Sequence, residues 1–147
     1  MATVSIFTLL ALGFFIFYVY PNFIFSKPLG DKLEYIGKTD YGCWLVCDAN
    51  PGSTYYYATD MSVEEVAGSL FTKATFKEKP QPGSTSLGDQ EIQDFWIQLQ
   101  NSHGQNLYIT YYQDASELRH FLHLKDTSKP HVISIGSESY AIAKDML

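Results

Sequence analysis

Apolar residues form one uninterrupted run near the amino terminus, and they alternate with polar residues along much of the chain that follows. Residues 4–25 contain no charged side chain. A helix that crosses a bilayer needs about 20 mostly apolar residues, which this run supplies. We therefore predict a single transmembrane helix, with residues 1–26 acting as an uncleaved membrane anchor. A cleaved signal peptide is the alternative, but no basic residue precedes the run and no small-residue cleavage site follows it.

The lysines after this run give a slight preference for one orientation in the membrane. Lys27, Lys32 and Lys38 follow the run, which by the positive-inside rule favours a cytoplasmic carboxyl-terminal domain. A short anchor followed by an exported domain is also a common bacterial arrangement. The sequence thus predicts a single-pass protein of a bacterial inner membrane and leaves the side of the domain open.

Residues 27–147 are predicted to form a soluble domain built from two similar halves. When the sequence is shifted by 52 residues, residues 44–77 align without a gap with residues 96–129. Eight aligned positions are identical. Ordinary composition would give about two identities by chance. We expect the two halves to extend over about residues 32–78 and 89–143.

Each half is predicted to fold as a strand, a turn, a strand and a helix. The turns fall at residues 50–53 and 102–105, and a glycine at the same place in both suits a turn with a positive φ. Ser62 followed by Glu65 matches a capping box, and Asp114 takes the place of Ser62 in the second half. Apolar residues then recur at helical spacing after each cap.

The segments outside the repeat complete the predicted fold. Residues 32–37 and one or two segments within residues 131–143 are expected to be strands, and residues 77–90, rich in proline and glycine, are expected to be a linker. The predicted fold class is therefore α+β. It consists of a transmembrane helix followed by a duplicated strand, turn, strand and helix domain, with an antiparallel sheet and both helices on one face.

The alternation of side chains along the predicted strands separates a core face from an outer face. The core face would carry Cys43, Leu45, Cys47, Tyr55, Tyr57, Phe95, Ile97, Leu99, Leu107, Ile109 and Tyr111. The outer face would carry Trp44, Val46, Tyr56, Trp96, Gln98, Tyr108 and Tyr112.

Large aromatic rings on an outer face need a cover. We therefore predict a binding surface, whose residues are Trp44, Tyr56, Trp96, Tyr108 and Tyr112. The alternative is that a terminal strand, a loop or a neighbouring copy of the domain covers these rings.

The sequence predicts no catalytic residue, no metal site and no cofactor. Cys43 and Cys47 would lie about 13 Å apart on one strand, whereas a disulfide needs Cα atoms within about 7 Å, so both are expected to be free thiols. His120 and His123 share the face of a predicted helix, but the other ligands of a metal site are not apparent beside them.

The net negative charge of the chain argues against one class of partner, nucleic acid. The chain has 16 acidic and 10 basic residues and a net charge of -6, which opposes binding to a phosphate backbone, so nucleic acid is not an expected partner. The expected function is a membrane-anchored, non-enzymatic protein-binding module. Such a module could be an accessory or assembly subunit of a membrane complex, or an inhibitor or immunity-type protein, and its partner another protein or a second copy. A small membrane-anchored enzyme is the alternative.

Overall fold

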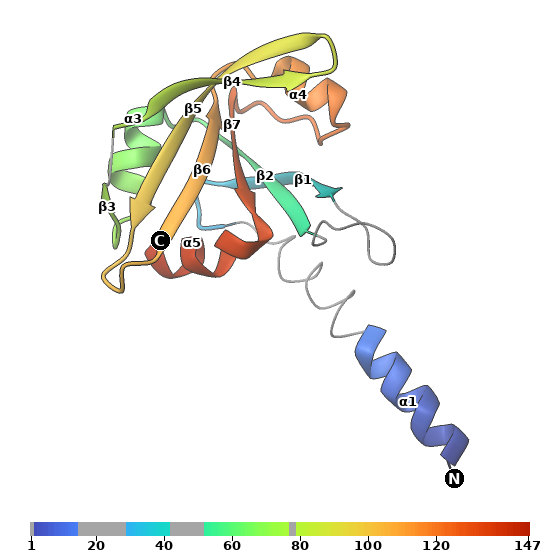
Figure 1. Ribbon diagram of the computed structural model, residues 1–147. Coiled ribbons are helices and arrows are strands. Elements are labelled where there is room, and N and C mark those ends of the chain that lie inside the picture. Colours follow the sequence, from blue (N-terminus) through green and yellow to red (C-terminus); the bar gives the residue numbers. More distant parts are fainter. Residues whose placement is uncertain (1, 15–28, 42–51, 77–78) are drawn as a thin grey trace.

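The computed structural model describes residues 2–14, 29–41, 52–76 and 79–147 (Figure 1). In chain order its elements are α1 (Ala2–Phe14), β1 (Glu34–Tyr41), β2 (Gly52–Thr59), α3 (Val63–Glu65), η2 (Val66–Leu70), β3 (Thr75–Phe76), β4 (Gln81–Leu87), β5 (Gln90–Gln100), β6 (Asn106–Tyr112), α4 (Ser116–Phe121), β7 (His131–Gly136), η3 (Ser137–Ser139) and α5 (Tyr140–Met146). Of the two segments labelled η, η2 is a π-helical turn and η3 is a 3-10 turn.

The strands of the described residues form one seven-stranded sheet. Its order is β1-β2-β7-β6-β5-β3, and β4 also pairs with β5. All of these strand pairs are antiparallel. The last strand in the chain, β7, lies between β2 and β6 in the middle of the sheet (Figure 1). The two parts of the sequence that were predicted as separate halves therefore share one continuous sheet.

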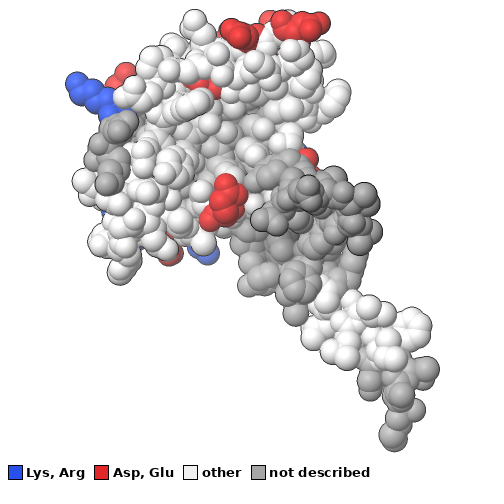
Figure 2. Space-filling view, viewed as in Figure 1, with Lys and Arg blue, Asp and Glu red and all other residues white. Residues whose placement is uncertain are grey.

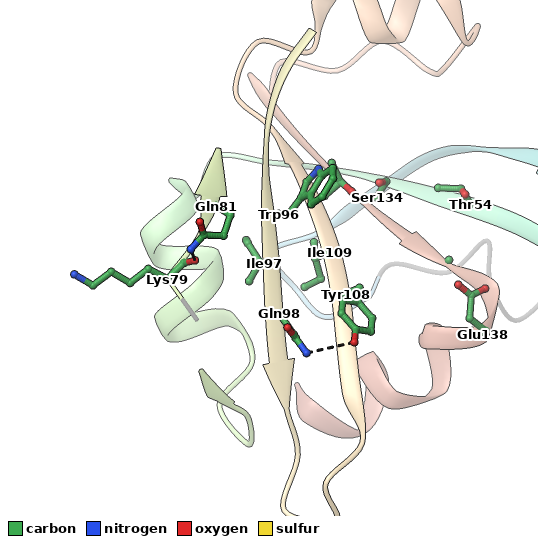
Figure 3. Close-up of a pocket in the computed structure, with 12 residues that line it drawn as sticks. Thr54, Lys79, Gln81, Trp96, Ile97, Gln98, Tyr108, Ile109, Ser134 and Glu138 are labelled. Atoms are coloured by element: carbon green, nitrogen blue, oxygen red, sulfur yellow. Dashed lines mark hydrogen bonds between the residues drawn. The ribbon is translucent and has the colours of Figure 1, made fainter. Parts of the chain in front are cut away.

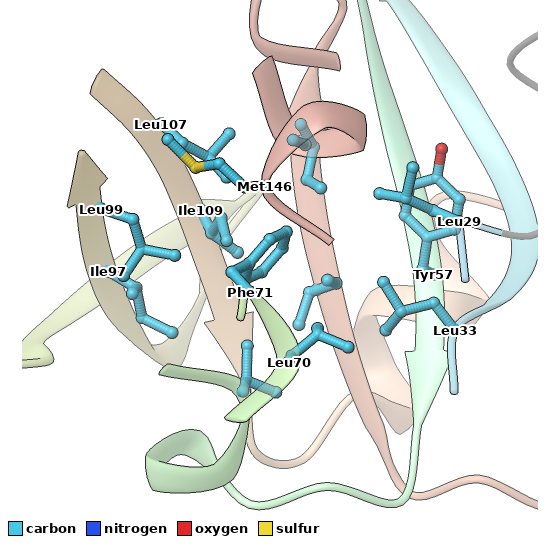
Figure 4. Close-up of a cluster of buried hydrophobic side chains, with 14 of the residues drawn as sticks. Leu29, Leu33, Tyr57, Leu70, Phe71, Ile97, Leu99, Leu107, Ile109 and Met146 are labelled. Atoms are coloured by element: carbon cyan, nitrogen blue, oxygen red, sulfur yellow. The ribbon is translucent and has the colours of Figure 1, made fainter. Parts of the chain in front are cut away.

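The larger hydrophobic cluster lies on one face of this sheet (Figure 4). Its strand residues are Tyr55, Tyr57, Ile97, Leu99, Leu107, Ile109, Tyr111, Ile133 and Ile135. Segments outside the sheet cover them with Leu29, Leu33, Val66, Leu70, Phe71 and Met146. Every strand residue in this cluster has an odd number, as the alternation of side chains requires.

The second cluster lies on the opposite face. Its members are Ile36, Tyr56, Ala58, Ile92, Tyr112, Ala115, Leu118, Leu124 and Val132. The predicted division into two faces is confirmed for the described strand residues. Trp44 and the predicted core residues Cys43, Leu45 and Cys47 lie outside the described part of the chain.

The prediction that both helices lie on one face is wrong. Val66 and Leu70 of η2 pack in the first cluster, whereas Leu118 of α4 packs in the second, on the other side of the sheet. Each face of a sheet whose strands carry large side chains on both sides needs a cover, because apolar surface is stabilised by removal from water. Among the described residues, η2 and α5 meet that need on the first face and α4 meets it on the second.

The predicted duplication is also wrong, because the first half does not form the expected hairpin. β2 begins at Gly52, where a turn was predicted, and it pairs with β1, so that Gly52 lies opposite Tyr41. The strand expected at residues 44–49 lies outside the described residues. The alignment of the two halves by sequence contains no information on such non-local pairing. The extra strand expected at residues 32–37 is the partner that β2 uses.

The second half folds as predicted in its hairpin. β5 and β6 pair from Asp94 opposite Tyr112 to Gln100 opposite Asn106, and Gly104 in the connecting turn has a φ of +78°. A left-handed backbone of this kind favours glycine.

The helix starts agree with the prediction to different extents. Ser62 and Glu65 form the predicted capping box, in which Ser62 N donates to Glu65 Oε2 at 2.8 Å and Glu65 N donates to Ser62 Oγ at 3.3 Å. In α4 the N-cap is Ala115, and Asp114 lies one residue earlier, where its carboxylate accepts a bond from Ser116 N at 3.2 Å.

Two segments differ from the expected type. The predicted linker contains β4, which forms a hairpin with β5 through a tight turn at Gly88, where φ is +62°. Pro82 is tolerated there because β4 lies at the edge of the sheet, where a missing N–H breaks no ladder. Of the segments within residues 131–143, the first is the strand β7, whereas the second belongs to helix α5.

The predicted transmembrane helix is also corrected. Within the described residues, no helix combines the length and the apolar character that crossing a membrane requires. α1 has 13 residues, and the rest of the predicted span lies outside the described part of the chain, as does the predicted boundary at residues 26 and 27.

Two buried tyrosines offer a matched test of this core. The Tyr57 hydroxyl is buried and has no hydrogen-bond partner among the described residues, whereas the Tyr111 hydroxyl donates to Met61 O at 3.0 Å. Burial raises the pKa of both, that of Tyr111 to about 12. Tyr57→Phe removes an unsatisfied polar group, so it should raise the free energy of unfolding by about 1 kcal/mol, whereas Tyr111→Phe should lower it by about 1 kcal/mol. Urea unfolding curves measure both, and equal effects in the two variants would contradict this account.

Candidate functional site

An open groove of about 450 Å³ lies on the second face of the sheet, on strand residues beyond those that pack against α4 in the described part of the chain (Figure 3). It runs across the strands from β4 to β2. Its lining residues include Gln81, Trp96, Gln98, Tyr108, Thr110, Ser134, Gly136 and Thr54, with Lys79 and Glu138 at its two ends.

Two exposed aromatic rings form the centre of this groove. Trp96 of β5 is 60% exposed and Tyr108 of β6 is 58% exposed. Trp96 lies opposite Thr110 and Gln98 lies opposite Tyr108, so the two rings are diagonal neighbours on adjacent strands. Such neighbours are about 7 to 8 Å apart, within reach of aromatic side chains. Gln98 Nε2 donates to the Tyr108 hydroxyl at 3.3 Å (Figure 3).

Chain comparisons identify no relative for this site. No protein-family model matches the sequence, and neither a curated protein nor a solved structure matches the chain. The function is therefore argued from the geometry of the groove.

The other predicted binding residues have different environments. Tyr56 is 7% exposed and Tyr112 is 5% exposed, because both lie under the part of the face that Leu118 and Leu124 cover. Burial raises the pKa of each hydroxyl, and hydrogen bonds to Thr39 and to Thr85 and Ser134, respectively, act in the opposite direction. Trp44 lies outside the described residues. The structure thus brings Trp96 and Tyr108 together at the surface and places Tyr56 and Tyr112 in the core beside them.

The side of the groove opposite Trp96 is lined by small residues. Ser134 and Gly136 lie on β7, and Thr54 of β2 pairs with Gly136. Ser134 pairs with Thr110, which in turn pairs with Trp96, so these three residues form one row across three strands. In the sequence, this side of the groove is indicated only by the alternation within β7, where Ser134 stands between two isoleucines.

A buried carboxylate lies beside Trp96. Asp94 is 1% exposed, its Oδ2 accepts a hydrogen bond from Thr85 Oγ1, and its Oδ1 has no partner among the described residues. Gly83 of β4 lies opposite Asp94. A Cβ at Gly83 would lie 2.6 Å from Asp94 Oδ1 and 3.0 Å from Trp96 Nε1. The absence of a side chain at Gly83 therefore allows Trp96 its present position.

Charged side chains are sparse on the face that carries the groove (Figure 2). Among the described residues that line it, Lys79 and Glu138 carry the charges, and they come from opposite ends of the groove (Figure 3). A general base must lie within hydrogen-bond reach of the proton that it removes, and a single charged group at each end of the groove leaves the central rings without such a group beside them. This arrangement suits contact with a surface better than acid–base chemistry.

The histidines singled out by the sequence lie elsewhere. His120 is in the last turn of α4, and His123 follows the helix with a φ of +52°. A shallow hollow brings both near Arg119 and Asp126. The described residues contain no group of three or more histidine, cysteine, aspartate or glutamate side chains that could hold a metal ion.

The close approach at Gly83 can be tested by adding one methyl group. Gly83→Ala should displace Trp96 or strain the buried Asp94 carboxylate, and overpacking of this kind lowers the free energy of unfolding by about 1 to 3 kcal/mol. In a Trp44→Phe background, Trp96 emission should shift as its indole moves. Gly68→Ala is the control, because a Cβ at Gly68 has no atom within 4 Å. Unchanged stability and emission for Gly83→Ala would refute the close packing of β4 on Trp96.

Proposed function

We propose that this chain is a non-enzymatic protein-binding module that binds its partner through the groove around Trp96 and Tyr108. The exposure of these two neighbouring rings carries the proposal. Aromatic residues are enriched in the cores of protein interfaces, since they bury large areas and keep a polar group for hydrogen bonding. Clusters of exposed apolar surface on an otherwise polar exterior mark such sites.

The rings are held in place before binding. Both lie on central strands whose other faces are packed in the first cluster, where the neighbouring Ile97 and Ile109 are almost fully buried. The bond from Gln98 further restricts the Tyr108 ring. A preorganised surface loses less conformational entropy on association, which strengthens binding.

The chemistry of the lining favours protein over nucleic acid. The groove offers amides, hydroxyls and aromatic faces but one lysine, whereas binding to a phosphate backbone relies on several basic side chains. The net charge of -6 acts in the same direction. Hydroxyls and amides can pair with the backbone and polar side chains of a protein surface at the rim of an aromatic contact.

Photo-crosslinking tests this proposal directly. A photo-crosslinking amino acid in place of Tyr108, in the full chain within its native cells, should form a covalent adduct with a protein. The same amino acid in place of the exposed Lys144, on α5, should not form that adduct. Absence of any adduct from position 108 would contradict the proposal.

Truncation of the central ring gives the energetic test. Trp96→Ala should weaken partner binding at least about 30-fold, the effect of a loss of about 2 kcal/mol at an interface anchor. Its free energy of unfolding should change by less than about 1 kcal/mol, because surface substitutions have small effects. Phe121→Ala is the matched control, since Phe121 is 52% exposed but is not part of the groove lining. Intact binding with a loss of about 3 kcal/mol or more in stability would mean that Trp96 is a core residue.

A further inference from the structure

We propose that the partner protein presents an arginine side chain to this groove, and that its guanidinium group stacks on the exposed ring of Trp96, next to the buried carboxylate of Asp94. This inference rests on the proposed protein-binding function and names the side chain that the groove recognises. Two features of β5 carry it: the indole ring is accessible, and the carboxylate beside it is incompletely bonded.

The carboxylate of Asp94 is buried without a cation beside it. Asp94 is 1% exposed, and its Oδ1 atom has no hydrogen-bond partner among the described residues. The ion pairs of the described part of the chain join Lys38 to Asp40 and Lys125 to Glu34, so neither includes Asp94. Burial of a charge costs free energy unless the charge is paired, and a buried acceptor without a donor adds to that cost. Recognition of a cation is a role that would retain such a group.

The carboxylate and the indole ring converge over Gly83. A Cβ at Gly83 would lie 2.6 Å from Asp94 Oδ1 and 3.0 Å from Trp96 Nε1. Because both atoms lie so close to one point, the edge of the indole that carries Nε1 lies beside the carboxylate. Trp96 is nevertheless 60% exposed and lines the groove, so much of its ring is accessible to a partner. A cation that stacks on this ring is therefore within the electric field of Asp94.

The ring and the carboxylate both attract a cation, and arginine suits them better than lysine. A cation within about 6 Å of an aromatic ring is attracted by the electrons of its face. A carboxylate that is removed from water attracts a nearby cation more strongly than a solvated one does. The planar guanidinium group of arginine stacks on aromatic rings and keeps N–H donors free at its edge. Gln81 and Thr110, which pair with Trp96 from its two sides, have side-chain oxygen atoms that can accept from these donors.

Lys79, the basic residue among the described residues that line the groove, does not take the place of this cation. It comes four residues before Gly83, a length of about 13 Å in an extended chain. Its side chain extends away from Trp96 (Figure 3). The net charge of -6 also attracts a basic partner at longer range. Charge complementarity therefore favours a basic segment of a protein as the occupant of the groove.

An uncharged analogue of arginine tests the role of the charge. Citrulline has the length and planar end group of arginine but is neutral. In NMR titrations of the full chain, the peptide acetyl-Gly-Arg-Gly-amide should shift the indole N–H signal of Trp96, which is identified by its loss in Trp96→Phe. The same peptide with citrulline should bind about tenfold more weakly, because the ring and the carboxylate no longer attract a charge. Equal affinities, or no shift of this signal with either peptide, would overturn the inference.

Asp94→Asn tests the part of the carboxylate. The variant keeps the size of the side chain and an oxygen that can accept from Thr85 Oγ1. Its preference for arginine over citrulline should fall to about threefold, the part that the ring contributes. Asp145→Asn is the matched control, because it makes the same change of charge at an exposed position on α5 and should keep a preference of about tenfold.

Stability and the control decide whether this effect belongs to Asp94. The melting temperature of Asp94→Asn should stay the same or rise, since a buried charge is removed. A clear fall in melting temperature would contradict the account of Asp94 as an unpaired charge. An unchanged preference in Asp94→Asn, or an equal reduction in Asp145→Asn, would also overturn the inference.

Photo-crosslinking in cells separates this inference from the proposed function. The adduct formed from position 108 should decrease about threefold when Asp94→Asn is added, and it should not decrease with Asp145→Asn. An undiminished adduct in Asp94→Asn would exclude recognition through the carboxylate and leave the protein-binding function standing. Absence of any adduct from the wild-type background would contradict the protein-binding function itself, and the inference would fall with it.

Discussion

Because successive side chains of a strand point to opposite faces, β2, β5 and β6 place large residues on both sides of the sheet. The chain must then cover two apolar faces, and burial of that surface is the main favourable term in folding. η2, α5 and residues near Leu29 cover the first face, with the first cluster between them and the strands. α4 and the segment around Leu124 cover the second face over part of its extent. The position of the groove follows from where this second cover ends.

Local features of the sequence predicted local features of the structure. The hairpin of β5 and β6, the capping box at Ser62 and the alternation of faces all depend on residues that are close in sequence, and all are confirmed. The insertion of β7 between β2 and β6 depends on contacts across most of the chain, which a pattern of 20 or so residues does not encode. The side of the sheet on which a helix packs was not predictable either. The side depends on the direction in which the short connection before each helix leaves the sheet. The connections before α3 and α4 have the same length, but they lead to opposite faces.

The sequence predicted which face of the sheet carries the candidate site, but not where on that face the site lies. Alternation placed Tyr56, Trp96, Tyr108 and Tyr112 together, and the structure does align them on one side of the sheet. The alternation of side chains could not show where along the strands the covering segments would end. Tyr112 and Tyr56 lie near Leu118 and Leu124 and are buried, whereas Trp96 and Tyr108 lie beyond that cover. The small residues of β7 gave a weak signal because glycine and serine are as common in turns as at contact surfaces.

The edges of the sheet explain why its face, and not its rim, is the more suitable surface for association. An exposed edge strand with regular unpaired groups can pair with another chain, and proteins limit this with bulges and prolines. β1 has a register shift between Tyr35 and Gly37, and its Ile36 O accepts a hydrogen bond from Lys125 N at 2.8 Å. β4, at the other edge, contains Pro82, which has no N–H to donate. Both edges of the described sheet are therefore poor templates for an added strand. The proposed binding of a partner across Trp96 and Tyr108 would leave the backbone pairing of the sheet unchanged, because it would use a part of the second face that the described residues leave exposed.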